Sequence, residues 1–410
     1  MRGRDSMNDK RPVTVVALVT AICLLGDSML YIILPVYWRE VGLQSLWEVG
    51  VLLSINRFVR LPLNPLIGWL YKRMSLRTGL FIAVLIGAFT TIGYGIFKGF
   101  IAWLILRSLW GVAWSFLRMG GYFTVISYSH DGNRGKHMGS YNGIFRLGSL
   151  AGMLVGGLLV PLLGVQTVSL AFGLMTFIAL IPIILFISDR QLSEQEEIPP
   201  EQSLRTQIWK KSILRVLICG LWIALLQAVF SSTLSLLIDT NYSDSISVFG
   251  IIISSTALAG VLQSIRWVWE PFLATKVGKI SDGFKGRIPL FLLSLLSAAI
   301  GYALIPWELP IYLWIIIVLF VMITSTATNT LMDALASDTA KTTSVIAVMT
   351  AYSVMTDLGS ALGPMVSYWF VEWEHGLLFV YLASAIIYLG IMIWYRPQSR
   401  VKKITPTSEL

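Results

Sequence analysis

The sequence predicts an all-α membrane protein with twelve transmembrane helices in two six-helix bundles. The chain of 410 residues is 56% hydrophobic and only 13% charged, whereas soluble proteins carry about 25% charged residues. Apolar stretches of 20 or more residues recur twelve times along the chain, and about 20 helical residues cross the hydrocarbon core of a bilayer. A single long polar segment, residues 189–211, separates six of these stretches from the other six.

The expected helices follow one another with short connections. Gly164 and Glu374 separate two of the neighbouring pairs. The polar segment 189–211 contains Pro199 and Pro200 and is expected to be a cytoplasmic linker between bundles at 13–188 and 212–396, with tails at 1–12 and 397–410. The helices are expected at residues 13–38, 46–71, 77–98, 100–128, 138–163, 165–188, 212–238, 246–270, 286–306, 309–337, 342–371 and 374–396.

Basic residues favour one side of the predicted bundle. Lys and Arg gather in both tails, in the turns after the second and fourth helices and in the segment 190–215, while the opposite loops offer only Arg39 and Lys98. The positive-inside rule therefore predicts that both termini are cytoplasmic. This topology explains the net charge of +9 without nucleic-acid binding. The expected location is the cell membrane, as in a bacterial inner membrane.

The two halves share a weak internal repeat. The second expected helix and the eighth both carry an arginine, a proline five residues later and then a glycine. The fifth and the eleventh both carry glycines at a spacing of four. Self-similarity between halves is expected of a duplicated polytopic protein whose site lies between the halves. The repeat residues are Arg57, Pro62 and Gly68 against Arg266, Pro271 and Gly278, and Gly148, Gly152, Gly156 and Gly157 against Gly359, Gly363 and Pro364.

These residues resemble the major facilitator superfamily over nearly the whole chain. Residues 68–77 are similar to the family's loop signature, with Gly68 and Arg73 in place and Tyr71 where the family has an acid. The second-half counterpart, residues 278–287, keeps the acid at Asp282 and ends at Arg287. The resemblance implies the major facilitator fold, in which the two bundles are related by pseudo-symmetry, and gating roles for both loops.

Two further motifs point to one branch of that family. Arg107 and Gly111 resemble its fourth-helix signature, and the resemblance implies a role for Arg107 in proton coupling. The fifth-helix glycines Gly148, Gly152, Gly156 and Gly157 look like the signature of drug/proton antiporters, with Met153 in place of its proline. Gly363 and Pro364 supply a glycine-proline pair in the eleventh helix instead.

Charged residues inside the apolar stretches predict a positively charged pocket. Five arginines lie there in the first half, with Asp27 as the one acid. Because charges at membrane depth are expensive, they tend to face a cavity and to serve function. Helical spacing places Arg57, Arg60 and Asn64 on one stripe. The expected substrate-binding set is Arg57, Arg60, Arg118, Arg146, Asn64, Tyr31, Trp114, Arg266, Glu270, Asp333 and Tyr352. Alternatives are that Arg118 and Arg146 serve packing and that Arg266 and Glu270 neutralise each other.

Asp27 is the expected proton carrier. A desolvated carboxyl holds a proton, and it loses that proton when an arginine approaches, so alternation between the two environments couples protons to transport. The alternative is a permanent ion pair of Asp27 with one arginine, such as Arg107.

The predicted function is proton-coupled export of a small polar anionic or zwitterionic organic molecule by a monomeric secondary transporter. Alternatives are an importer or facilitator of an organic anion or phosphorylated solute, a hydrophobic multidrug exporter, a lipid flippase and a membrane-embedded enzyme. No cofactor or metal is expected, because the sequence has no metal-ligand cluster and no phosphate-binding loop. An enzyme is disfavoured for the same reason.

Overall fold

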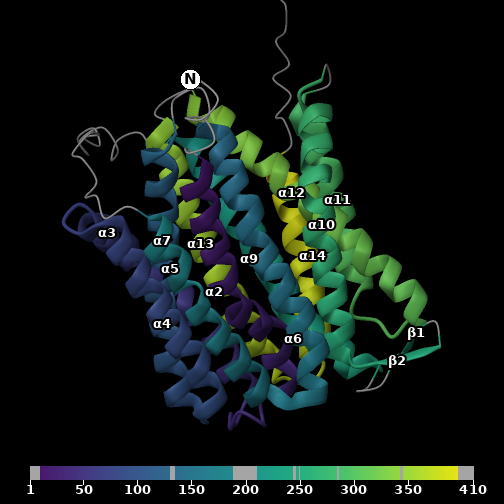
Figure 1. Ribbon diagram of the computed structural model, residues 1–410. Coiled ribbons are helices and arrows are strands. Elements are labelled where there is room, and N and C mark those ends of the chain that lie inside the picture. Colours follow the sequence, from purple (N-terminus) through teal and green to yellow (C-terminus); the bar gives the residue numbers. More distant parts are fainter. Residues whose placement is uncertain are drawn as a thin grey trace, which may run out of the picture.

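Helices form nearly all of the structure, a computed structural model that describes residues 10–129, 134–187, 210–242, 246–248, 250–283, 286–341 and 345–395 (Figure 1). The first half contains α2 (Lys10–Tyr37), α3 (Leu46–Tyr71), α4 (Leu76–Ile96), α5 (Phe100–Ser127), α6 (Arg134–Ile178) and α7 (Leu180–Phe186). The second half contains α9 (Lys211–Tyr242), β1 (Ile246–Val248), β2 (Ile251–Ile253), α10 (Ser255–Ser281), α11 (Arg287–Leu304), α12 (Ile311–Lys341), α13 (Val345–Val371) and α14 (Gly376–Tyr395).

Consecutive helices run up and down the bundle, so their ends gather at two faces. We call the face at which α2 begins the termini face and the face that carries β1 and β2 the hairpin face; they lie at the top and bottom of Figure 1. Gly164 has a φ of 79° and splits α6 into two passes. With four helices before α6 and six after α7, the described chain crosses the bundle twelve times, which confirms the predicted fold class.

The eighth predicted helix is wrong in its first part. Residues 246–253 form an antiparallel hairpin in which Ile246 pairs with Ile253, and Gly250 turns it with a φ of 79°. Helix α10 begins only after Ser254, whose Oγ accepts a hydrogen bond from the Ala257 N–H at 3.2 Å, and it continues to Ser281, beyond the expected end at 270. Hydropathy does not distinguish a short apolar strand from a helical turn.

The membrane-spanning character of the helices is uneven. Eight helical segments in the described chain are long and apolar enough to cross a membrane, one of which, Lys136–Phe186, contains two expected spans. Three helices, α3, α10 and α13, fall outside this set. Helix α3 packs against α13, and α10 packs against α6, so all three lie where the halves meet. Arg266 on α10 is therefore buried, and Arg57 on α3 and Asp357 on α13 are half-buried, as charges at membrane depth require.

Glycines hold the first helix of each half against a partner in the same half. A Cβ at Gly152 would collide with the carbonyl oxygen of Leu25 on α2, and one at Gly363 would lie 2.7 Å from the carbonyl oxygen of Leu225 on α9. Because glycines let helix backbones approach closely, the glycines of the fifth predicted helix are expected to pack against a helix of the other half. That prediction is wrong for Gly148, Gly152 and Gly156, which all contact α2, and right for Gly157. The linker 189–211 lies outside the described residues up to residue 209, and the bundle boundaries stay a prediction.

Candidate functional site

The two halves touch closely on the side of the hairpin face. A Cβ at Gly157 of α6 would lie 2.6 Å from the carbonyl oxygen of Thr256 on α10, and one at Gly50 of α3 would lie 2.8 Å from the carbonyl oxygen of Pro364 on α13. The Met365 N–H also donates to Ser54 Oγ at 3.1 Å. Backbones this close leave no passage for a solute, so the pathway between the halves is closed at this end.

The side of the termini face is more open. Added Cβ atoms at Gly139, Gly143 and Gly278 would meet nothing within 4 Å. A groove of about 380 Å³ lies between α6 and α10 there, and Asn142, Arg146, Trp267 and Glu270 are among the residues that line it. The halves are thus in backbone contact toward the hairpin face, and a groove lies between α6 and α10 toward the termini face.

A buried ion pair lies in the first half. Arg107 of α5 is fully buried and pairs through Nη1 with Asp27 of α2, which is also buried. The Arg107 Nε donates to the Leu52 carbonyl oxygen at 2.9 Å, and Asn56 Nδ2 donates to Asp27 Oδ1 at 3.4 Å. A buried carboxylate needs such a partner, because an unpaired charge in a dry site is costly. In this conformation Asp27 thus has the fixed partner that the alternative interpretation of the sequence named.

Arg57 and Arg60 of α3 have aromatic partners instead of acidic ones. The Arg57 Nε donates to the Tyr31 hydroxyl at 3.4 Å, and the Arg60 guanidinium lies 5.9 Å from the centre of the Trp114 ring. Both arginines are half-buried, and no carboxylate of the described residues lies within 4.0 Å of either. Cation–π contact stabilises a guanidinium without neutralising it, so these contacts leave both groups with their positive charge.

Two ion pairs cross between the halves. Arg118 Nη1 on α5 lies 3.1 Å from Asp357 Oδ2 on α13, and Arg146 Nη1 on α6 lies 3.3 Å from Glu270 Oε1 on α10. The Arg118 Nε also donates to the Tyr122 hydroxyl at 3.2 Å. These contacts place the helices of opposite halves around a shared set of charges near the middle of the bundle.

Arg266 and Glu270 do contact each other, as their spacing indicated. The Arg266 Nε lies 3.5 Å from Glu270 Oε2, and Arg266 is buried while Arg146 is largely exposed. Glu270 is thus shared between one arginine of its own half and one of the other half. Glu270 therefore neutralises part of the charge of Arg146 and Arg266, whereas no described carboxylate pairs with Arg57 or Arg60.

The second half holds a neutral amide pair of its own. Gln227 of α9 and Asn329 of α12 are hydrogen-bonded through their side chains. With its amide oxygen turned toward Arg266, Gln227 accepts from Arg266 Nη1 at 3.3 Å. Nearer the termini face, the Tyr352 hydroxyl donates to Asp333 Oδ1 at 2.8 Å. The predicted residues Arg266, Asp333 and Tyr352 therefore all make polar contacts within the second half.

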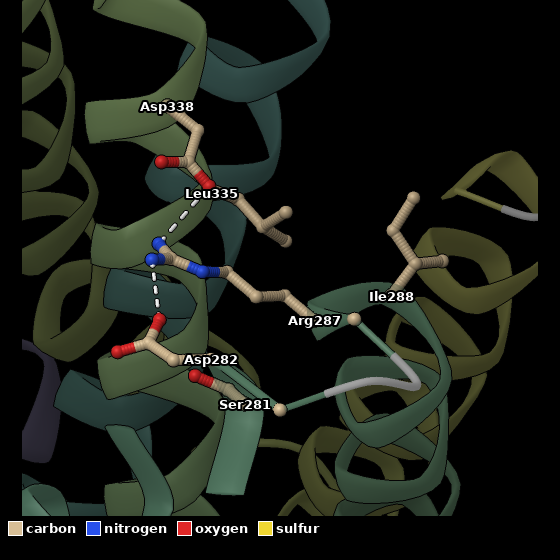
Figure 2. Close-up of a pocket in the computed structure, with 8 residues that line it drawn as sticks. Ser281, Asp282, Arg287, Ile288, Leu335 and Asp338 are labelled. Carbon is tan, nitrogen blue, oxygen red and sulfur yellow. Dashed lines mark hydrogen bonds and ion pairs between the residues drawn. The ribbon is translucent and has the colours of Figure 1, made fainter. Parts of the chain in front are cut away.

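At the connection between α10 and α11, Arg287 lies between two carboxylates, and we call this arrangement the carboxylate bracket. Arg287 Nη2 lies 2.7 Å from Asp282 Oδ1, and Arg287 Nη1 lies 3.0 Å from Asp338 Oδ2 on α12, as Figure 2 shows. A pocket of about 410 Å³ surrounds the bracket. The two ion pairs of Arg287 join the ends of α10, α11 and α12 at the termini face.

The matching loop of the first half uses aromatic contacts. Tyr71 stands where the family signature has its acid; it is fully buried, and its hydroxyl donates to the Phe116 carbonyl oxygen at 2.9 Å. The Arg73 guanidinium lies 4.1 Å from the centre of the Trp69 ring. Tyr71 therefore anchors the end of α3 to α5 by packing, where the second half uses charge.

Three residues of the site are absent from the predicted substrate-binding set. Asp357 carried a signal, since it is the one acid in α13, but the sequence does not show that it faces Arg118. Asn56 and Gln227 are neutral and carried none. Of the predicted residues, Asn64 is half-buried, and its Oδ1 accepts no hydrogen bond from the part of the chain that the structure describes, so it can accept one from a ligand.

Solved transporter structures share this arrangement. The fold matches a bacterial homologue of the human lysosomal transporter Spinster in an inward-facing, unoccupied conformation (TM-score 0.73, 12% identity, 95% of each chain). It also matches the nucleoside transporter NupG (TM-score 0.74, 15% identity, 95% of this chain and 98% of that chain). A peptide transporter of the POT family in complex with sulfate gives a TM-score of 0.75 at 13% identity, over 94% of this chain and 95% of that chain. At these identities the likeness concerns the fold alone.

Sequence relatives point the same way. The uncharacterized MFS-type transporter YcaD of Salmonella newport (strain SL254) is 23% identical over 145 residues, which are 35% of this chain and 38% of that relative. The match thus spans well under two thirds of the curated relative. The Major Facilitator Superfamily profile matches residues 16–276 and 272–409. With two matching segments that together cover nearly all of its length, this chain belongs to the Major Facilitator Superfamily, a family of membrane transporters rather than enzymes.

Proposed function

We propose that this chain is a proton-coupled secondary transporter that exports a small polar molecule with anionic groups. The observation that carries the proposal is the pair Arg57 and Arg60, which lies deep in α3 and has no carboxylate partner among the described residues. Two half-buried guanidinium groups repel each other unless an anion approaches them. A solute with a carboxylate or phosphate group supplies that anion.

Alternating access supports the transport part of the proposal. The halves are in backbone contact at the hairpin face, while Gly139, Gly143 and Gly278 toward the termini face have free space around them. If the positive-inside rule holds, the termini face is cytoplasmic, and this state is open to the cytoplasm. A solute would enter there, and the halves would then rock to open the hairpin face.

Proton coupling rests on Asp27 and Arg107. Asp27 lies close to the arginines of α3. Asn56 donates a hydrogen bond to Asp27 and directly precedes Arg57 along that helix. In this state Asp27 pairs with Arg107. Protonation would require Arg107 to move away in another state of the cycle, and that exchange would link proton release to the conformational change.

The test of the anion site uses purified protein in proteoliposomes. We expect Arg57→Gln and Arg60→Gln to weaken binding of succinate and glycerol phosphate by about tenfold or more, since each removes one charge near the bound anion. Binding of neutral glycerol should not change. Arg39→Gln is the matched control, because Arg39 lies exposed at the hairpin face over Trp38. Equal losses for charged and neutral solutes would remove the anionic-substrate proposal in favour of a hydrophobic exporter.

The test of coupling uses the same vesicles. Asp27→Asn should abolish solute movement driven by a pH gradient and should leave one-for-one solute exchange, which moves no net proton. If gradient-driven transport survives in Asp27→Asn, the coupling group lies elsewhere.

A further inference from the structure

We propose that Asp357 is an internal counter-ion that occupies the anion position of the arginine cluster, and that a small dianionic solute displaces it. The cluster consists of Arg57, Arg60 and Arg118. The inference rests on the proposed function, because it names the charge class of the solute at the same site. It adds a role for a residue that neither the sequence motifs nor the family match assigns.

The arginines of the cluster and their counter-ion come from opposite halves. All three arginines belong to the first half, on α3 and α5, whereas Asp357 belongs to α13 of the second half. Asp357 contacts Arg118 at 3.1 Å, and its carboxylate is near enough to Arg57 and Arg60 for their charges to interact. One carboxylate therefore reaches across the interface into a cationic site that its own half does not contain.

Exposure distinguishes this ion pair from a structural one. The side chains of Arg118 and Asp357 are 23% and 27% exposed, whereas those of Arg107 and Asp27 are 0% and 11% exposed. Arg107 is also held by the Leu52 carbonyl oxygen. A partly hydrated pair loses little when its partners separate, while a dry pair leaves a buried charge behind. Asp357 can thus be replaced by a ligand, and Asp27 cannot without rearrangement.

The charge balance selects the solute. Among the described residues, the three guanidinium groups face Asp357, and the second carboxylate near Arg57, that of Asp27, already pairs with Arg107. Two positive charges are therefore left uncompensated. A monoanion that displaces Asp357 would only replace the charge that Asp357 already supplies. A dianion, such as a dicarboxylate or a phosphate monoester, neutralises one charge more and binds with a net gain. The chemistry shared by these solutes is two negative charges within one small group.

Displacement also links binding to movement. The contact between Arg118 and Asp357 joins α5 to α13, and it holds the halves together near the middle of the bundle. When the solute takes the place of the carboxylate, this link is lost and α13 is free to move relative to α5. The contacts of the solute with the arginines would then compensate for the lost contact between Arg118 and Asp357.

The experiment measures binding of inorganic phosphate to the detergent-purified full chain by titration calorimetry at low ionic strength, with acetate as the monoanion. We expect phosphate to bind wild type more tightly than acetate does. In Asp357→Asn, phosphate should bind about tenfold more tightly than in wild type, because a like charge close to the anion is gone. Asp357→Glu should restore the wild-type affinity.

Asp338→Asn is the matched control. It removes one carboxylate and one ion pair from the same half, but its partner Arg287 lies at the termini face, so its phosphate affinity should equal that of wild type. Equal phosphate affinity in wild type and Asp357→Asn would overturn the counter-ion role, and so would failure of Asp357→Asn and Asp357→Ser to fold. Arg57→Gln separates the two proposals, because loss of phosphate binding in that variant keeps the arginine site even if Asp357 proves structural.

Discussion

The first and second halves of the molecule place their first helices in the same register and then differ in charge. Gly152 of α6 packs on Leu25 of α2, and Gly363 of α13 packs on Leu225 of α9. Two residues further along, α2 carries Asp27 and α9 carries Gln227. The internal repeat that the glycines indicated is therefore present in the packing, residue by residue.

The partners of these two residues differ in the same way. Asp27 pairs with Arg107 of α5, and Gln227 pairs with Asn329 of α12. The charged pair is buried and the amide pair is half-buried, and both join the first helix of a half to its fourth. Because the neutral pair shows that this contact forms without charge, the fold does not require an ion pair there. The charge in the first half is thus better explained by function than by stability, since a buried ion pair adds little stability over neutral groups.

The strongest test of the difference between the halves is to replace the charged pair of the first half with the neutral pair of the second. Asp27→Asn or Arg107→Gln alone leaves a buried group without its partner, and we expect a loss of about 3–5 kcal/mol in the free energy of unfolding. The double variant Asp27→Gln with Arg107→Asn copies the second half and should recover most of that loss. Thermal unfolding in detergent measures both. A single variant as stable as wild type would show that the pair is loosely held and free to separate.

Glycine contacts give a second test of the two halves, because both halves pack a glycine against the backbone of their first helix. Gly152→Leu and Gly363→Leu each drive a side chain into the backbone of the neighbouring helix, and overpacking of this kind costs about 3 kcal/mol. We expect similar drops in melting temperature for the two variants.

Gly157→Leu is the contrasting variant, because Gly157 contacts α10 of the other half. It should keep each half folded and instead open the hairpin face, which spin-label distances between α6 and α10 would report. A melting temperature as low as that of Gly152→Leu would contradict this division between contacts within and between halves.

The neutral pair can be tested on its own. Gln227→Leu leaves Asn329 and Arg266 without an amide partner, and an unsatisfied buried polar group costs about 1–3 kcal/mol. The loss should be smaller than that of Asp27→Asn because the groups left behind include Arg266, which keeps Glu270. Unfolding measured side by side for the two variants decides this, and a larger loss for Gln227→Leu would reverse the order of the halves.

The smallest effect is expected at the open face. Gly143→Ala meets nothing within 4 Å and should stabilise α6 by about 0.5–1 kcal/mol, as alanine does in a helix interior. If the termini face closes during transport, the same variant should slow transport although it melts higher. Unchanged transport would show that Gly143 stays clear of α10 throughout the cycle.

Segment-level properties could be predicted from the residues. The number of helices, their alternation, the break at Gly164 and the pairing of Arg266 with Glu270 follow from hydropathy, backbone preference and helical spacing, which are local. The hairpin at Ile246–Ile253 could not be predicted, because a short apolar run is compatible with strand and helix alike.

Pairings across the bundle needed the tertiary structure. The sequence named Asp27, Arg107 and Arg118 as charged residues of the pathway, and only the packing decided that Arg107 holds Asp27 in a dry site while Arg118 meets Asp357 in a partly hydrated one. Composition and spacing alone determined that this chain is a twelve-helix membrane protein with a surplus of buried cations. Which cation is neutralised, and by which half, depends on helices distant in sequence that pack together, so the tertiary structure alone decides it.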